Sequence, residues 1–381
     1  MKKRGFRLAT SMLALSLTLP LLVGCKTEQK PVQESGSQSS SGTQTSTSEA
    51  PETQAQERRF TDSVGREITL PQQIQKVAPS GPLAQLVLYT AYPDKLVGLA
   101  KAFGKNQLEY FPEKFHKLPE FGQFYGGKGS LNMENLLAAQ PDLIVDIGEA
   151  KKTMKEDMDG VQKKLEIPTA FVEARLPEMP KTYQKLAELF NEPGKTSELA
   201  AYCEQVLERA KKVRESLKEG EKIPVYWAMG DKGLNTNAEE SFQAEVLQLV
   251  GADNVAKVKA VSRGGGSEVS FEQLLSWKPK YILVDNPQLL ETMQADSQWQ
   301  DYLQQTGAQL VLQPTAPYGV LSNPPSVNRI LGISWLGQLL YPDQYQLDLR
   351  TEFRNFYKLF YQVELTDKQL DFLLEGFPNL K

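Results

Sequence analysis

The sequence predicts an α/β protein with two lobes, each built on a mostly parallel sheet, joined by one long α-helix. Three observations predict this fold. Short β-rich runs alternate with helical patterns, one segment recurs at an offset of 138 positions, and a long helical stretch separates the two copies. We therefore expect a signal peptide at 1–24, a disordered linker at 25–58, an N-terminal lobe at 59–180, a connecting helical segment at 181–219 and a C-terminal lobe at 220–381.

The first 24 residues have the pattern of a cleaved export signal. Four basic residues precede an apolar run from Leu8 to Leu22, which is short for a bilayer span of about 20 residues. The run leads into Gly24 and Cys25, and this ending resembles the lipobox of bacterial lipoproteins. Lipidation of the Cys25 thiol would anchor the mature chain to the bacterial cell membrane on its extracytoplasmic side. The alternative is an ordinary secretory signal that happens to end in cysteine.

Residues 25–58 are rich in Ser, Thr, Gln, Glu and Pro and nearly free of apolar side chains. Such a composition cannot bury enough apolar surface to offset the entropy of ordering the chain, so it predicts a flexible spacer. Removal of the four basic residues of the leader leaves 39 basic and 47 acidic residues, a net charge of −8. An acidic body without a basic stripe argues against binding to nucleic acid.

Cysteine and histidine usage limits the chemistry of the folded part. Beyond Cys25, the only cysteine is Cys203, which lies in a helical pattern and is interpreted as a small buried residue. The single histidine, His116, makes a His-rich zinc or copper site improbable.

The β-rich runs of the folded part are short and well separated by helical patterns. This alternation predicts parallel sheets with helices on both faces. The expected strands are Lys76–Ala78, Val97–Ala100, Leu143–Asp146, Thr169–Val172, Val225–Met229, Tyr281–Asp285 and Leu310–Leu312.

The internal repeat determines the expected architecture. Residues 130–145 align without gaps on residues 268–283, and each copy reads as a capped helix, a proline and a buried strand. Asn132 and Ser270 are the expected N-caps. A period this long predicts two similar α/β lobes rather than a solenoid. Chance similarity of two ordinary helix–strand units is the alternative, but a Gly-rich loop precedes each copy in the equivalent place.

The stretch between the copies, from Pro180 to Glu219, is helical in pattern and is broken only at Glu192–Gly194. Its second part, Lys195–Lys218, contains no proline or glycine and would span about 36 Å as a helix. A helix of that length predicts a stiff brace between the lobes and restricted closure. The alternative is a peripheral helix of the C-terminal lobe.

In this order of elements the sequence resembles the class III solute-binding proteins of iron-siderophore, haem and cobalamin importers. The resemblance covers about residues 59–381 and is carried by Phe60–Pro71, the two repeats, the long helix and Asn323–Arg329. It implies two Rossmann-like lobes that hold an iron chelate, haem or corrinoid between them. It also implies a monomer that carries no cofactor of its own and delivers its ligand to an ABC permease and ATPase. A bare metal or an oxyanion is the alternative ligand.

In that family, one glutamate per lobe meets arginines of the permease, and the matching positions are Glu134 and Glu272. The two residues are also equivalent under the repeat. A structural explanation competes, because a glutamate in the first turn of a helix is favoured by the helix dipole without any partner.

The ligand-binding candidates come from the Gly-rich loops and from the C-terminal lobe. Arg263 suits carboxylate or hydroxamate oxygens, and Tyr125 offers a ring face, a phenol or an axial ligand for haem iron. Aromatic residues near strands could stack on a planar ligand, although such residues are more often core. For the basic candidates, solvated charges or a helix-surface arginine are the alternatives. The full set is Tyr125, Lys128, Arg263, Trp227, Tyr318 and Arg329.

An enzyme is not expected. Gly122–Lys128 imitates the start of a phosphate-binding loop, but Gly129 stands where that motif needs Ser or Thr. The sequence has no Gly-x-Ser-x-Gly elbow, and one histidine leaves little room for a Ser–His or Cys–His pair. An exported carboxylate-based hydrolase and a lipoprotein that acts in adhesion are the alternatives from other functional classes.

Overall fold

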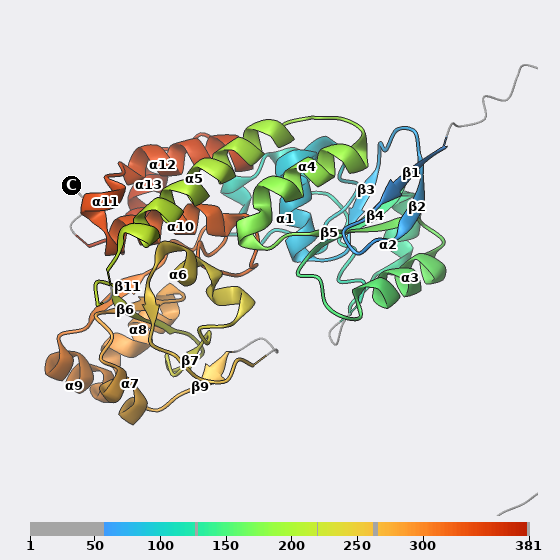
Figure 1. Ribbon diagram of the computed structural model, residues 1–381. Coiled ribbons are helices and arrows are strands. Elements are labelled where there is room, and N and C mark those ends of the chain that lie inside the picture. Colours follow the sequence, from blue (N-terminus) through green and yellow to red (C-terminus); the bar gives the residue numbers. More distant parts are fainter. Residues whose placement is uncertain (1–56, 126–128, 219, 262–265, 379–381) are drawn as a thin grey trace, which may run out of the picture. The chain divides into compact units, whose positions relative to one another are not determined.

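The computed structural model describes residues 57–125, 129–218, 220–261 and 266–378 (Figure 1). Cys25, Lys128 and Arg263 therefore lie outside the described residues. Among the residues described, no helix combines the length and the apolar character needed to cross a bilayer.

The N-terminal lobe contains a parallel sheet with strand order β3-β4-β5. An antiparallel hairpin, β1–β2, precedes it. Three of the four strands expected from the sequence form here. The fourth, Val97–Ala100, makes only isolated bridges, Val77 to Leu96 and Leu99 to Glu120, so that prediction was wrong. The elements are β1 (Glu57–Thr61), β2 (Glu67–Pro71), β3 (Val77–Pro79), α1 (Pro82–Ala91), α2 (Met133–Ala139), β4 (Leu143–Gly148), α3 (Met154–Leu165) and β5 (Thr169–Glu173).

The C-terminal lobe contains a second parallel sheet with strand order β11-β10-β6-β8. The two sheets are separate, as expected for two lobes. The sequence missed the two-residue strands, because two residues are too few to show a period. The elements are β6 (Pro224–Ala228), β7 (Asn235–Thr236), α6 (Glu245–Val250), β8 (Asp253–Asn254), β9 (Ser267–Glu268), α7 (Phe271–Trp277), β10 (Tyr281–Val284), α8 (Pro287–Ala295), α9 (Ser297–Thr306), β11 (Gln309–Leu312), α10 (Asn328–Leu340), α11 (Pro342–Tyr345), α12 (Leu349–Phe356) and α13 (Asp367–Leu374).

Two helices, α4 (Met179–Phe190) and α5 (Thr196–Ser216), follow the first parallel sheet and precede the second along the chain. They pack against each other (Figure 1). α4 ends because Asn191 adopts a left-handed conformation, with φ of 51°, and the break falls where the sequence predicts it. The 21 residues of α5 correspond to about 32 Å. Its buried face includes Cys203, as expected, and burial raises the pKa of that thiol far above its ordinary value.

The long helix lies in a hydrophobic core that both lobes share. In β4, Val145 faces this shared core while Ile144 faces a second cluster on the other side of the sheet. In β10, Leu283 and Ile282 divide in the same way. Alternate residues of a strand point to opposite faces, so each sheet has one face toward the shared core and one toward a cluster of its own lobe.

Candidate functional site

A cleft of about 730 Å³ lies between loops of the two lobes. This volume is in the range of pockets that hold small molecules, about 300–1,000 Å³. Its N-terminal wall follows the carboxyl ends of β3 and β4, where ligands bind in open α/β sheets. The lining residues are Ser80, Gly81, Pro82, Leu83, Ala84, Gln123, Tyr125, Asp146, Ile147, Gly148, Glu149, Lys151 and Met154 from one lobe, and Glu240, Ser241, Phe242, Gln243, Ala260, Val261 and Pro325 from the other.

The carboxylate of Asp146 is the centre of a hydrogen-bonded group on the N-terminal wall. Ser80 Oγ donates to one carboxylate oxygen, and the Tyr125 hydroxyl donates to the other at 2.5 Å. Asp146 is buried, and burial raises its pKa although both hydroxyls favour the charged form. Burial and the neighbouring Asp146 raise the pKa of Tyr125 far above its ordinary value, so its phenol stays protonated. Both oxygens of this carboxylate are therefore occupied within the protein.

The start of helix α1 forms the neighbouring part of the same wall. Gly81 is the N-cap residue, Pro82 occupies the first turn, and no side chain caps the helix. The first N–H groups of a helix lack partners inside it and carry the positive end of the helix dipole. Because Gly81, Leu83 and Ala84 line the cleft, the start of α1 is the part of this wall that favours an anionic group, while Asp146 and Glu149 add carboxylates to the same wall.

The opposite wall is supported by a buried ion pair between Glu245 and Arg329. The side chain of Arg329 is 1% exposed, and its Nη2 lies 3.2 Å from Glu245 Oε2. Its Nη1 donates to the carbonyl of Phe242 at 2.7 Å, and its guanidinium lies 4.6 Å from the centroid of the Phe242 ring. Burial lowers the pKa of Arg329 to about 10. Arg329 does not line the cleft, because Glu245 pairs with its guanidinium behind the wall. Contact of Arg329 with a ligand stays a prediction.

Two aromatic candidates also lie in the core. Trp227 is fully buried in β6, faces the shared core and does not line the cleft. Stacking of Trp227 on a ligand stays a prediction. Tyr318 packs against the shared core, edge-on to Phe111 at a centroid distance of 6.1 Å, and does not line the cleft. Aromatic residues near strands are more often part of the core than of a ligand site, and Trp227 is such a core residue. Of the four candidates that belong to the described residues, Tyr125 alone lines the cleft.

The sequence reading missed Ser80, Asp146, Phe242 and Glu245. Asp146 carried a signal, since a carboxylate within an otherwise apolar buried strand is costly unless it has partners. The other three lie in loops or at a helix start, where one sequence offers no periodicity that would identify them.

Glu134 and Glu272 occupy the first turns of α2 and α7, and both are exposed. The pKa of Glu272 is lowered by hydrogen bonds that its carboxylate accepts from the backbone N–H of Glu272 itself and from the side chain of Ser270. These placements match the equivalence that the repeat predicts. They agree with docking to a permease and equally with a helix-dipole role.

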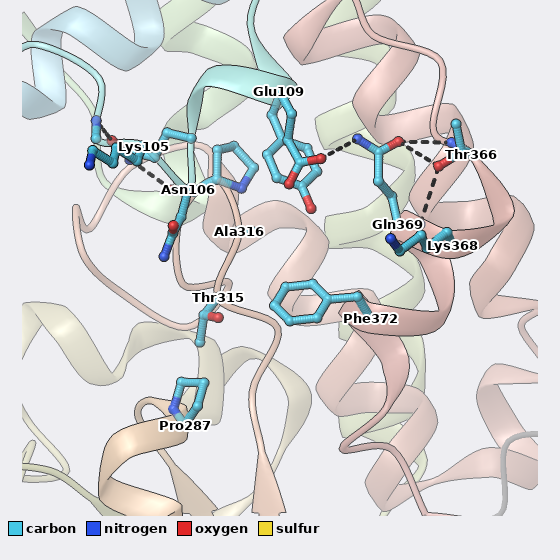
Figure 2. Close-up of a pocket in the computed structure, with 14 residues that line it drawn as sticks. Lys105, Asn106, Glu109, Pro287, Thr315, Ala316, Thr366, Lys368, Gln369 and Phe372 are labelled. Carbon is cyan, nitrogen blue, oxygen red and sulfur yellow. Dashed lines mark hydrogen bonds between the residues drawn. The ribbon is translucent and has the colours of Figure 1, made fainter.

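A second groove, of about 1160 Å³, lies where the loop 104–110 approaches α13 and the loop 315–317 (Figure 2). Gln369 Nε2 donates to Glu109 Oε2 across it at 3.3 Å, and Gln107 Nε2 donates to the carbonyl of Pro317 at 2.8 Å. Phe372 projects into it and is 49% exposed (Figure 2). Although this groove is larger, the buried carboxylate and the uncapped helix start belong to the cleft, so we place the candidate site there.

Comparison with known proteins agrees with this architecture. The periplasmic binding protein family matches residues 87–309. The chain is 25% identical over 339 residues to the molybdate-binding protein MolA of Haemophilus influenzae, which covers 81% of this chain and 92% of that protein. It is 23% identical over 226 residues to the vitamin B12-binding protein of Pectobacterium carotovorum, covering 56% of this chain and 71% of that one.

Among solved structures, an ABC transporter solute-binding protein from Sulfurospirillum deleyianum superimposes with a TM-score of 0.75. It is 29% identical and covers 84% of this chain and 99% of its own. The family match covers more than half of the chain, and the structural likeness confirms the expected α/β fold of two lobes. The chain therefore belongs to the periplasmic binding protein family.

Proposed function

We propose that this protein is the extracytoplasmic receptor of an ABC importer and that it holds its solute in the cleft between the lobes. The family, the likeness to an ABC transporter solute-binding protein and the cleft at the carboxyl ends of β3 and β4 support this role. The signal segment and Cys25 support export and a lipid anchor. Binding without chemical turnover is proposed, so hydrolysis of glycosides by the purified protein would contradict it.

We propose an oxyanion of the molybdate type as the solute. The uncapped start of α1 in the cleft wall carries this proposal, because its free N–H groups can donate to anionic oxygens. The relative MolA, whose match covers most of both chains, binds molybdate according to its name. The lining carries the positive charge of Lys151 together with the carboxyl groups of Asp146, Glu149 and Glu240. Arg263 and Lys128 remain candidates on sequence grounds alone.

Isothermal titration of the mature chain with molybdate, tungstate, sulfate and phosphate tests this solute. Saturable binding of molybdate or tungstate, with weaker binding of the other two, is expected. Leu83→Pro removes one N–H from the first helical turn, where proline is tolerated, and should weaken binding about tenfold. Leu83→Ala, which keeps the N–H, is the matched control. Equal affinity in both variants would contradict a role for the start of α1.

An iron chelate, haem or corrinoid is the second candidate. The volume of the cleft exceeds what one small oxyanion fills, and several relatives are named vitamin B12-binding proteins. Titration with cobalamin, ferric hydroxamate, ferric catecholate and haem discriminates these ligands from the oxyanions. Iron ligation by Tyr125 is disfavoured, because its hydroxyl donates to Asp146 and burial raises its pKa. A Soret band that Tyr125→Phe abolishes would reverse that conclusion.

Docking of Glu134 and Glu272 to the permease is proposed from their equivalent, exposed positions. The double variant Glu134→Lys/Glu272→Lys should abolish uptake of the solute in cells while the purified protein keeps its affinity. Glu156→Lys, an exposed acidic residue in the first turn of α3, is the control. Uptake that survives the double reversal would leave only the helix-dipole role.

A further inference from the structure

The carboxylate of Glu245 contacts two separate parts of the fold through three residues. Glu245 is the first residue of α6 in the C-terminal lobe and is 2% exposed. Its Oε1 accepts from Arg175 Nε at 2.9 Å and lies 2.8 Å from Arg175 Nη2. Its Oε2 accepts from the backbone N–H of Leu176 at 3.1 Å and lies 3.2 Å from Arg329 Nη2. One carboxylate of one lobe is thus held by the loop that follows β5 in the other lobe and by helix α10.

The same carboxylate determines the environment of Arg329. This side chain is 1% exposed, and its only ion-pair partner among the described residues is Glu245. Loss of one member of a buried charge pair leaves the other without compensation, which is far more costly than the loss of an exposed pair. Arg175, in contrast, is about half exposed, so it keeps its hydration when unpaired.

The segment that precedes Glu245 in the chain forms part of the cleft wall. Glu240, Ser241, Phe242 and Gln243 line the cleft and directly precede α6. Arg329 bonds to the carbonyl of Phe242 and lies over its ring, so the pair with Glu245 holds this segment from behind. A displacement of Glu245 would therefore move the wall relative to the N-terminal lobe.

We propose that Glu245 is a positioning residue of the solute site. The contacts of its carboxylate with Arg175 and Leu176, here called the clasp, hold the loop after β5. Its contact with Arg329 holds residues 240–243 in the wall of the cleft. The effect of Glu245 on affinity rests on the proposed function, whereas the clasp between the lobes does not. The solute itself is not contacted by Glu245, since both carboxylate oxygens are occupied by protein donors.

Glu352 provides a matched control. This glutamate of α12 accepts from Ser334 Oγ at 2.9 Å and from the Tyr202 hydroxyl at 3.1 Å, and it lies 3.6 Å from Arg209. Its side chain is largely buried, and it does not line the cleft. Glu→Gln removes one buried charge without a change of volume at either position.

The experiment compares Glu245→Gln, Glu352→Gln and the wild type by hydrogen exchange and by titration with molybdate and cobalamin. In Glu245→Gln, amide exchange in residues 175–179 and 240–250 should rise about tenfold or more, while the strands of both sheets keep their protection. Affinity for whichever probe the wild type binds should fall about tenfold. Glu352→Gln should leave both the two segments and the affinity unchanged.

Arg175→Gln supplies a second test that does not depend on the stability of the Glu245 variant. It removes the half-exposed guanidinium that contacts Glu245 and leaves the buried pair of Glu245 and Arg329 in place. The protein should therefore fold and still show faster amide exchange in residues 175–179 and 240–250. Unchanged exchange there, or a rise spread evenly over the whole chain, would overturn the proposal. A wild type that binds neither probe would contradict the proposed solutes, while the exchange comparison would still decide the clasp.

Discussion

The two copies of the repeated segment form the same unit in the two lobes. α2 and α7 each begin at a side-chain cap, Asn132 and Ser270, and each ends at a left-handed residue before a parallel strand. The aspartates of the two strand regions then differ. Asp146 of β4 lines the cleft and accepts from Ser80 and Tyr125. Asp285, which follows β10, accepts from Gln313 Nε2 at 2.9 Å and does not line the cleft.

This difference shows that the helix–strand unit supplies a frame and the surrounding loops supply the site. The unit is specified locally, by a cap, an apolar face and a strand of alternating residues. The cleft is specified by contacts between segments far apart in the sequence, such as Arg175 with Glu245. The following predictions test how far the equivalence of the two copies extends.

The largest effect is expected at the buried leucines of the two helices. Leu136 and Leu274 occupy equivalent positions, and both are completely buried. Leu136→Ala and Leu274→Ala should each lower the free energy of unfolding by about 2–5 kcal/mol, through lost transfer energy and cavity formation. Urea denaturation measures the loss. A loss below about 1 kcal/mol in one copy alone would show that the units are not equivalent in packing.

The next effect concerns the ionisation of Asp146. Burial raises its pKa from 3.8, so its contribution to stability is complete below that value and is lost as the pH rises through the raised pKa. Relative to Asp146→Asn, the wild type should therefore become more stable as the pH falls from about 7 to 4, by about 1.36 kcal/mol per unit of raised pKa. Denaturation curves across this range measure it.

Asp285→Asn is the paired control, because burial also raises the pKa of Asp285. The same pH dependence is expected for its stability. Only Asp146→Asn should alter solute affinity, since only Asp146 lines the cleft. A change of affinity in Asp285→Asn would refute the distinction between the two aspartates.

A smaller effect is expected at the caps. Asn132→Ala and Ser270→Ala should each lower the free energy of unfolding by about 1 kcal/mol. The loss should be larger at Ser270, because Gln273 completes a reciprocal capping box there and Asn132 has no such partner. Thermal denaturation of the two variants checks the order. A larger loss at Asn132 would mean that the capping box contributes little.

The smallest effect is expected at Leu137, whose side chain is 54% exposed on α2. Leu137→Gln should change the free energy of unfolding by less than about 0.5 kcal/mol. Leu275, its counterpart on α7, packs against the cluster of the C-terminal lobe, so Leu275→Gln should be clearly destabilising. Equal losses at the two positions would place Leu137 in a contact that the structure does not contain.

The sequence alone determined the frame of this protein. Periodicity placed six of the seven expected strands, and the repeat identified the two lobes. The absence of proline and glycine from residues 195–218 indicated the long helix. The sequence also predicted both caps, because a cap depends on residues within one turn. Local rules suffice for such features, since the interacting groups are neighbours in the chain.

Only the tertiary structure decided which side chains form the cleft. Trp227 and Arg329 are residues of types that bind planar or anionic ligands, yet the fold buries the first in the core and pairs the second with Glu245. Ser80, Tyr125 and Asp146 are separated by 66 residues at most in the chain, and they meet because β3 and β4 are adjacent parallel strands. The physical reason is that burial and pairing of a charge depend on distant segments, which composition and spacing do not encode.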